Sequence, residues 1–98
     1  MRADKPDSAT AAIVEELRAR GYHVEYAHSM PFDLLVIGYH RLEFRTICVI
    51  VEVKNEGETA KFTDREKRFQ ADLADLSYLS VYCVATCAEH VRACFGDY

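Results

Sequence analysis

The sequence predicts an α/β domain in which a mixed central sheet is flanked by helices. Three observations support this fold class. Two segments in the middle of the chain are apolar at almost every position, as is typical of strands near the centre of a sheet. Other segments carry apolar residues at helical spacing. The chain has 98 residues, of which 50% are hydrophobic, so residues 1–98 can form a single domain with its own core.

The elements are expected in the order α-β-β-β-α-β-α, after a loose arm over residues 1–6. The first helix is predicted over residues 9–20 and ends before Gly21. Its apolar face is formed by Ile13, Val14 and Leu17. Residues 22–27 alternate between apolar and polar side chains, so we expect them to form the first strand.

Two apolar strands follow, over residues 33–38 and 46–54. The first begins with Asp33, and the second ends in Glu52-Val53-Lys54. Charged groups at the end of a buried strand are expensive to desolvate, so we expect them to have a function or a pairing partner. If the strands form an antiparallel hairpin, Asp33 falls level with the last residues of the second strand. It shares the face of Glu52 and Lys54 only if it sits directly opposite one of them.

In that register, two carboxylates and one ammonium group converge at one end of the hairpin. Two carboxylates at close range favour a hard divalent cation such as Mg²⁺ or Mn²⁺. A lysine beside them can hold a water molecule or stabilise charge that develops on a phosphate. The alternative is a salt-bridged strand end with no catalytic role.

The second half of the chain is predicted to add two helices and one strand. A helix over residues 64–76 follows a polar connection. Thr63 is its N-cap, and Thr63 and Glu66 form a capping box, in which each side chain satisfies a backbone N–H group of the other residue. The last two elements are a strand over residues 80–85 and a helix over residues 87–95 capped by Thr86.

The net charge of −4 counts against a simple nucleic-acid binder. A divalent cation bound to the acidic strand ends would offset part of this charge locally. No apolar run has the length needed to span a bilayer, and the N-terminus lacks the apolar segment of a signal peptide. We therefore expect a cytoplasmic protein with no membrane partner, in which the four cysteines stay reduced.

The combination of Asp33, an intervening hairpin and Glu52-Val53-Lys54 resembles the signature of the PD-(D/E)XK nuclease superfamily. The element order is similar to the restriction-endonuclease-like core of that superfamily. Within it, the chain looks closest to the VRR-NUC and Holliday-junction-resolvase-like branch. The resemblance implies a Mg²⁺-dependent endodeoxyribonuclease that hydrolyses phosphodiester bonds in branched or junction DNA. It also implies a homodimer, because a two-fold pair suits a four-way junction.

The resemblance assigns roles to three side chains and one backbone group. Asp33, Glu52 and the carbonyl of Val53 would bind Mg²⁺ (or Mn²⁺), and Lys54 would orient the attacking water or stabilise the transition state. Many members place a further glutamate on the first helix, where this sequence has Asp7, Ser8 or Thr10. We therefore keep Asp7 and Glu16 as additional candidates. The helix after the motif usually carries a glutamine one turn before an aromatic residue, and the candidates for that role here are Glu66 and Gln70.

Several basic residues near these motifs are candidates for DNA contacts. His28 lies in the predicted loop before Asp33, and the others lie in the hairpin loop and around the start of the second long helix. The full set is His28, Arg41, Arg45, Lys61, Arg65 and Arg68. The alternative is that these residues are ordinary solvated surface.

Two other hypotheses compete with the nuclease. Zinc binding is suggested by Cys83, Cys87, His90 and Cys94, although zinc ligands usually come from turns in Cys-x₂-Cys pairs, and buried thiols explain most of this set. The domain can also be a non-catalytic module that keeps the nuclease fold and binds nucleic acid or protein. A third arrangement makes it one subunit or fragment of a larger nuclease.

Overall fold

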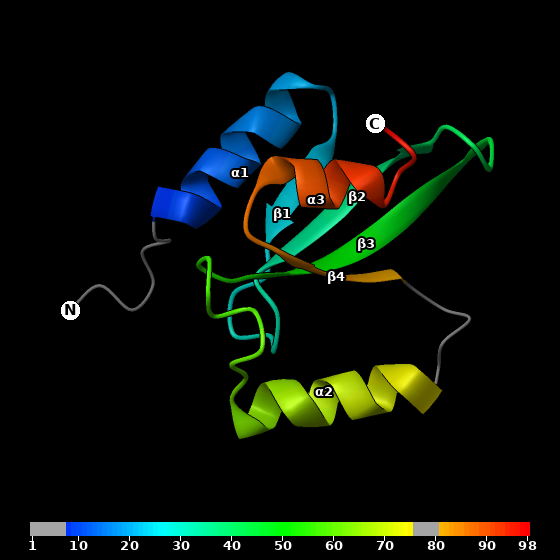
Figure 1. Ribbon diagram of the computed structural model, residues 1–98. Helices are drawn as coiled ribbons and strands as arrows, with labels where there is room; N and C mark the ends of the chain where they lie inside the picture. Colours follow the sequence, from blue (N-terminus) through cyan, green and yellow to red (C-terminus); the bar gives the residue numbers. More distant parts are fainter. Residues whose placement is uncertain (1–7, 76–80) are drawn as a thin grey trace.

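The computed structural model describes residues 8–75 and 81–98 (Figure 1). The predicted arm over residues 1–6, the candidate Asp7, the predicted helix end at Leu76 and the predicted strand start at Ser80 lie outside these residues. In chain order, the elements are α1 (Ser8–Ala19), β1 (His23–Tyr26), β2 (Leu34–His40), β3 (Arg45–Val53), α2 (Asp64–Asp75), β4 (Val81–Ala85) and α3 (Ala88–Ala93).

The strands form one four-stranded sheet in the order β1-β2-β3-β4. β1 pairs antiparallel with β2, β2 pairs antiparallel with β3, and β4 lies parallel to β3. The parallel pair is possible because α2 and its connections carry the chain across the sheet between β3 and β4. The sheet is therefore mixed, and the predicted α/β class is confirmed.

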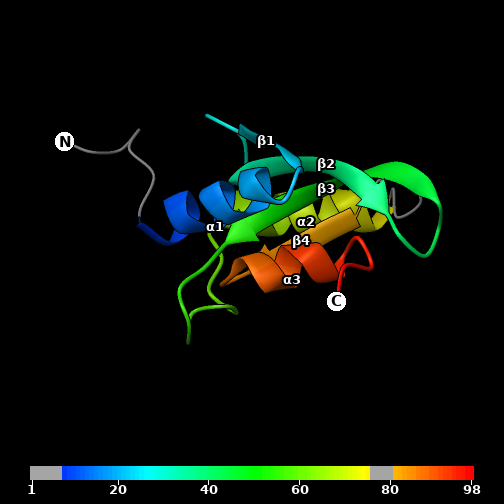
Figure 2. The ribbon, with the colours of Figure 1, turned by 90° about the horizontal axis from the view of Figure 1, so that it is seen from above.

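The helices cover the two faces of the sheet unequally. Figures 1 and 2 show α1 and α3 on one face and α2 on the other. Strand side chains alternate between faces, so every second residue of β2 and β3 points to α1 and α3. The core lies in this layer and consists of Ile13, Val14, Leu17, Val24, Leu34, Val36, Val49, Val51, Cys83, Ala85, Ala88, Val91 and Phe95.

The face below α2 is only partly covered. α2 contributes no fully buried residue, and it contacts the sheet side through Phe69, whose ring lies 5.3 Å from the ring of Phe32 and 6.2 Å from that of Tyr82. Cys48 and Ile50 on this face are half-buried, whereas Glu52 is buried. The expectation that β3 is buried on both faces is therefore wrong for one face, because a single loosely packed helix covers it.

Several boundaries differ from the sequence-based expectations. β2 continues through Gly38 to His40, so the hairpin loop is shorter than predicted and spans residues 41–44. The backbone of the third helix is capped by Cys87 and not by Thr86, and Cys87 makes no side-chain cap hydrogen bond. The Thr86 backbone N–H instead donates to the His90 ring nitrogen Nδ1 (3.1 Å). In the described part of the chain, no helix is both long and apolar enough to cross a bilayer.

Candidate active site

Asp33 lies directly before β2 and is held against the end of β3. The β2–β3 register ends with Leu34 opposite Val51, directly after Asp33. The Asp33 backbone N–H donates to the Val51 carbonyl (2.9 Å), and its carboxylate oxygen Oδ2 accepts a hydrogen bond from the Val53 N–H (2.7 Å). The Asp33 carboxylate also lies close enough to Glu52 for its charge to raise the pKa of that residue. The end of the hairpin therefore brings Asp33 and Glu52 near each other.

Glu52 is the most unusual residue of this group. Its side chain is buried, with 4% of its surface exposed, and only one carboxylate oxygen has a partner. Oε2 lies 3.2 Å from the Lys54 ammonium, whereas Oε1 is buried without a hydrogen bond. Burial raises the pKa of Glu52 to about 8, and the negative charges of Asp33 and Glu66 raise it further. A carboxylate oxygen in this position is stabilised by a proton or by a cation.

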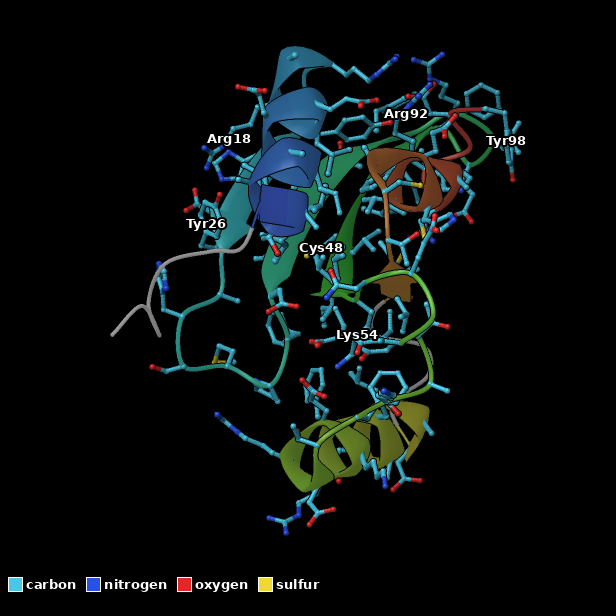
Figure 3. The ribbon with its side chains drawn as sticks, turned by 60° about the vertical axis from the view of Figure 1, so that its left-hand side comes forward. Arg18, Tyr26, Cys48, Lys54, Arg92 and Tyr98 are labelled. Atoms are coloured by element: carbon cyan, nitrogen blue, oxygen red, sulfur yellow. The ribbon has the colours of Figure 1, made fainter. Side chains whose placement is uncertain are left out.

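Lys54 joins β3 to the start of α2 (Figure 3). Its ammonium lies 3.2 Å from Glu52 Oε2 and 3.1 Å from Glu66 Oε1, and 4.9 Å from the centre of the Phe62 ring. Burial by itself lowers the pKa of Lys54, but the carboxylates of Glu66 and Glu52 outweigh that effect and raise it. The ammonium is therefore charged at neutral pH, and it is held at the centre of the group.

Glu66 enters the site from α2, and its position follows from the capping box. The Glu66 N–H donates to Thr63 Oγ1 (3.1 Å), and Glu66 Oε1 accepts from the Thr63 N–H (2.9 Å), which confirms the predicted box. The same Oε1 atom binds Lys54. Burial acts to raise the pKa of Glu66, but its bonds to Thr63, Glu52 and Lys54 lower it. We call Asp33, Glu52, Lys54 and Glu66 the strand-end cluster.

Gln70, the other candidate on α2, forms its side-chain hydrogen bond with Tyr82, whereas Glu66 binds Lys54. Its side-chain amide donates to the Tyr82 hydroxyl (3.1 Å), on β4. Burial raises the pKa of the Tyr82 hydroxyl. The nearby carboxylates of Glu52 and Glu66 raise it further, and the Lys54 ammonium opposes this. Sequence reasoning included neither Tyr82 nor Phe62 among the site residues. For Phe62, the only signal in the sequence was its position as an aromatic residue directly before the capping box.

The proposed acid on α1 is not part of the strand-end cluster. Glu16 is half-exposed, and its carboxylate pairs with Arg20 (3.3 Å) and Arg92 of α3 (3.9 Å). The structure therefore places this additional candidate beside α3, in ion pairs with arginines and not beside Lys54. Asp7, the other candidate, precedes the described residues.

Two of the predicted DNA contacts lie at the start of α2 and in the loop before Asp33. Arg65 follows the N-cap of α2 and donates to the Ser29 carbonyl (2.6 Å), which ties α2 to the loop before Asp33. His28 is an exposed residue of the same loop, and its ring stacks against Tyr26 with the ring centres 6.0 Å apart.

Two further predicted DNA contacts, Lys61 and Arg68, lie on the surface. Lys61 pairs with Glu58 at 3.6 Å, and Arg68 is exposed on α2.

The other two predicted DNA contacts lie at the opposite end of the hairpin. His40 and Arg45 form the last pair of the β2–β3 register, and Arg45 pairs with Glu43 (2.6 Å). From Leu34 to His40 the strand advances by about 20 Å, at roughly 3.3 Å per residue. Arg41 and Arg45 therefore do not contact the strand-end cluster.

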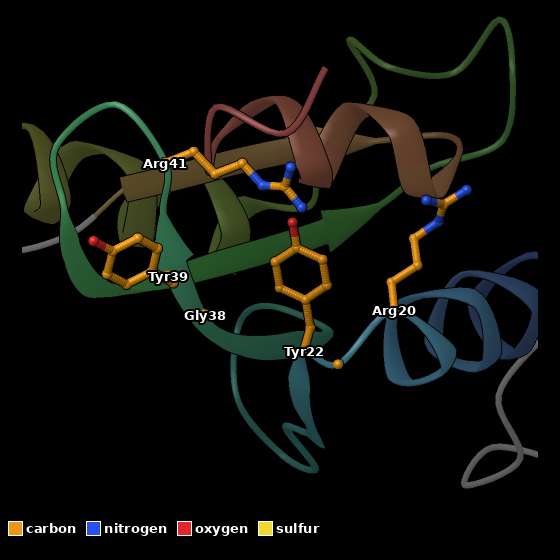
Figure 4. A pocket seen from close by; sticks show the side chains of 6 residues that line it. Arg20, Tyr22, Gly38, Tyr39 and Arg41 are labelled. Atoms are coloured by element: carbon orange, nitrogen blue, oxygen red, sulfur yellow. The ribbon is translucent and has the colours of Figure 1, made fainter.

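Arg41 instead borders a shallow pocket of about 200 Å³ (Figure 4). The pocket is lined by Arg20, Gly21, Tyr22, Gly38, Tyr39 and Arg41. Tyr22 donates to Asp97 Oδ2 (2.8 Å), and Arg41 lies 3.4 Å from Asp97 Oδ1. This arginine–tyrosine pocket was not predicted, because its lining residues come from two segments that are separate in the sequence, 20–22 and 38–41.

The oxygen atoms of the strand-end cluster fit part of a ligand set for a divalent metal ion. Within residues 8–75 and 81–98, no group of three or more His, Cys, Asp or Glu side chains is placed so that it could hold a metal. The set expected for Mg²⁺ is smaller, with two carboxylates and the Val53 carbonyl. The buried Oε1 atom of Glu52 fits that set, because a hard oxygen ligand is present without a partner.

Comparisons with known proteins add no further information about this site. Searches of protein-family models, curated proteins and solved structures each found no significant match to the chain. Inference about function therefore depends on the geometry and chemistry of the strand-end cluster.

Proposed function

We propose that this protein is a metal-dependent nuclease of the PD-(D/E)XK type, with a restriction-endonuclease-like core, that hydrolyses phosphodiester bonds in DNA. One observation carries the proposal: Glu52 is buried beside Asp33 and Lys54, with one carboxylate oxygen that has no partner. A purely structural ion pair is stable only when its remaining oxygens are satisfied. The sequence resemblance to VRR-NUC and junction-resolving nucleases supports the same assignment.

In this proposal, Asp33, Glu52 and the Val53 carbonyl hold Mg²⁺ or Mn²⁺. When bound, the ion polarises the scissile phosphate and lowers the pKa of a bound water. Glu52 has to lose its proton before it can act as a ligand, and its pKa of about 8 couples this step to pH. Asp33 is oriented for the task because its backbone and one of its carboxylate oxygens bond to β3.

Lys54 is the catalytic residue for charge stabilisation. Its ammonium is anchored between two carboxylates, so its position is fixed before substrate binds. From there it can donate a hydrogen bond to a water molecule or to a phosphate oxygen that gains negative charge. Glu66 is a positioning residue, because it acts through Lys54 and through the start of α2.

Branched or junction DNA is the proposed substrate, and a homodimer is the proposed assembly. Arg65, next to Glu66 on α2, and the exposed His28 in the loop before Asp33 can contact phosphates of the bound DNA. A two-fold dimer would present two clusters to two strands of a junction. Analytical ultracentrifugation at micromolar concentration tests the assembly, and a monomer there would remove the junction-resolving form of the proposal.

The nuclease proposal is tested by incubating the purified protein with branched, single-stranded and duplex DNA at low salt. Low salt is used because phosphate contacts weaken steeply as salt rises. Each substrate is tested with Mg²⁺, Mn²⁺ or EDTA. Glu52→Gln is compared with Glu58→Gln, a matched control whose carboxylate forms a surface pair with Lys61. Cleavage that requires both metal and Glu52 supports the proposal, and folded protein that cleaves none of the substrates contradicts it.

A non-catalytic module is the second candidate, favoured by one specific observation. Lys54 is already paired with two carboxylates, and these pairs connect β3 to α2. If this is their whole role, Mg²⁺ will not change the melting temperature, and Glu52→Gln will raise it with or without EDTA. Metal-dependent stabilisation that disappears in Glu52→Gln would exclude this candidate.

A further inference from the structure

A pair of thiols meets on the face of the sheet opposite the strand-end cluster. Cys83 lies in β4, is buried with 7% of its surface exposed, and pairs in register with the core residue Val51. Cys94 is the C-cap of α3 and is half-buried. Both thiols donate to the same backbone oxygen, the carbonyl of His90, at 3.7 Å for Cys83 and 3.6 Å for Cys94.

The local chain geometry explains why these residues meet. From Cys83 to Thr86, β4 advances by about 10 Å at roughly 3.3 Å per residue. The chain then turns, and α3 returns over the strand from its N-cap Cys87 to its C-cap Cys94. That helix also advances by about 10 Å, at about 1.5 Å per residue. The end of α3 is therefore level with Cys83, and Figure 1 shows the helix lying over this part of the sheet.

The two thiols differ in reactivity. A hydrogen bond from Cys83 lowers the pKa of Cys94 to about 7, although partial burial opposes this effect. The same bond and burial raise the pKa of Cys83. The lowered pKa favours the thiolate form of the half-buried Cys94, whereas the raised pKa of Cys83 keeps that thiol protonated beside it. A nucleophilic thiolate beside a second thiol is typical of a redox-sensitive cysteine with a resolving partner.

We propose that Cys94 and Cys83 form an oxidation site that reacts with hydroperoxides and closes to a disulfide between α3 and β4. The Cys94 thiolate attacks one peroxide oxygen, the O–O bond breaks, hydroxide leaves, and sulfur is oxidised to a sulfenic acid. The Cys83 sulfur then attacks the Cys94 sulfur, the S–O bond breaks, and the Cys83 proton leaves with the hydroxide as water. In total, two thiols and one hydrogen peroxide give one disulfide and two waters.

The site is independent of the proposed nuclease. Cys83 points to α3, whereas Glu52 and Lys54, on the neighbouring strand, point to α2. The other thiols serve as internal controls. Cys48 lies on the α2 face of β3, where burial raises its pKa, so it should react more slowly. Cys87 is the N-cap of α3 and lies at the other end of that helix from Cys94.

The test treats the reduced full chain with hydrogen peroxide at pH 7 and digests it without reductant. Mass spectrometry should find Cys83 and Cys94 joined within one chain, with the loss of two hydrogen atoms and reversal by dithiothreitol. Cys94→Ser should slow thiol loss by at least about tenfold, because the proposal makes the Cys94 thiolate the group that attacks the peroxide. Cys48→Ser should have no effect.

Cys83→Ser should stop the reaction at the sulfenic acid, which dimedone labels at Cys94. Because Cys83 is buried and its substitution can disturb the fold, differential alkylation of the wild-type chain gives a second readout. There, Cys94 should be alkylated first at pH 7. A disulfide between other cysteines, or equal rates in wild type and Cys94→Ser, would overturn the proposal.

Discussion

Two buried carboxylates in this protein behave in opposite ways. Glu52 of the strand-end cluster is 4% exposed, and burial raises its pKa to about 8. Asp97, near the C-terminus, is 8% exposed, yet its bonds to Arg92 and Tyr22 lower its pKa. Arg92 lies 3.1 Å from Asp97, and Tyr22 lies 2.8 Å from it. Burial alone therefore does not decide the pKa, because the number and kind of partners decide it.

The comparison distinguishes the Asp97 network, which stabilises the fold, from Glu52, which is a candidate for function. The Asp97 network is satisfied on both carboxylate oxygens and joins Tyr22, which directly precedes β1, to the hairpin loop and α3. Glu52 has one oxygen satisfied by Lys54 and one without a partner, so the ionised form is poorly compensated in the folded state. Proteins keep such a costly arrangement at sites where a ligand or a reaction requires it.

The largest expected effect is loss of cleavage in Glu52→Gln. The amide keeps the size of the side chain but binds a divalent cation much more weakly, so activity should fall to the limit of detection. Circular dichroism should show a folded protein that is at least as stable as wild type, because residue 52 can no longer ionise in its buried position. Asp97→Asn is the comparison variant, and it should cleave DNA normally under conditions where it is folded. Loss of cleavage in both variants would point to a fold defect.

Lys54→Met should reduce cleavage by about 10²–10³-fold, because one preorganised donor to the transition state is lost. Mg²⁺ should still bind, since the carboxylates remain, and isothermal titration calorimetry measures that binding. Lys61→Met is the matched control, because Lys61 is exposed and pairs only at the surface with Glu58. If Lys54→Met cleaved at the wild-type rate, the role assigned to the ammonium would be wrong.

The two carboxylates should give stability with opposite pH dependence. The folded pKa of Glu52, about 8, lies above its ordinary value of 4.5, so its contribution is fully present below pH 4.5 and is lost as the pH rises through 8. The folded pKa of Asp97 lies below its ordinary value of 3.8, so its contribution is present above that pH and is lost as the pH falls through the folded value.

Urea denaturation in EDTA, from below pH 3.8 to above pH 8, measures the effects of both carboxylates on stability. Wild type should lose on the order of a few kcal/mol between pH 5 and 8, and Glu52→Gln should not show this loss. Asp97→Asn should cost about 1–3 kcal/mol at neutral pH, because the amide has no charge and keeps only one acceptor oxygen for Arg92, Tyr22 and Arg41. Adding Mg²⁺ at pH 8 should restore stability to wild type only. A flat wild-type profile would contradict the pKa assigned to Glu52.

The smallest expected effect is that of Arg41→Ala in the arginine–tyrosine pocket. Arg41 is exposed, so its pair with Asp97 should add little to stability. If the pocket holds a DNA phosphate, affinity should fall equally for all sequences, and the salt dependence should lose about one unit of slope. Lys67→Ala is the control, because Lys67 is exposed on α2 and lies outside the pocket. Identical salt slopes for Arg41→Ala and Lys67→Ala would exclude the pocket as a specific phosphate contact.

Several features could be predicted from local patterns along the chain. The apolar run of β3 and its charged end placed Glu52 and Lys54 on one face at the edge of a core, since strand residues two apart share a face. The spacing of Thr63 and Glu66 predicted the start of α2, because a capping box involves only neighbouring turns of backbone. The α/β class followed from the same short-range periodicities.

Other features depend on residues that are far apart in sequence. The sequence left open whether Asp33 lies near Glu52, because a slip of one residue would have turned it away, and the packing at the end of the hairpin decided it. Packing of α2 against the sheet selected Glu66, and not Gln70, as the partner of Lys54. Glu16 was predicted to join the strand-end cluster but pairs with Arg92, because the approach of α1 to α3 is a tertiary contact.

The sequence by itself thus determined where the helices and strands form and which charged residues stand at the strand ends, because periodicity and capping act over a few residues. Only the tertiary structure decided which of those charges meet, which oxygen of Glu52 lacks a partner, and how Cys83 comes to lie beside Cys94. The physical reason is that burial and hydrogen bonding at these sites depend on strand register and helix packing. Both are determined by contacts between distant segments.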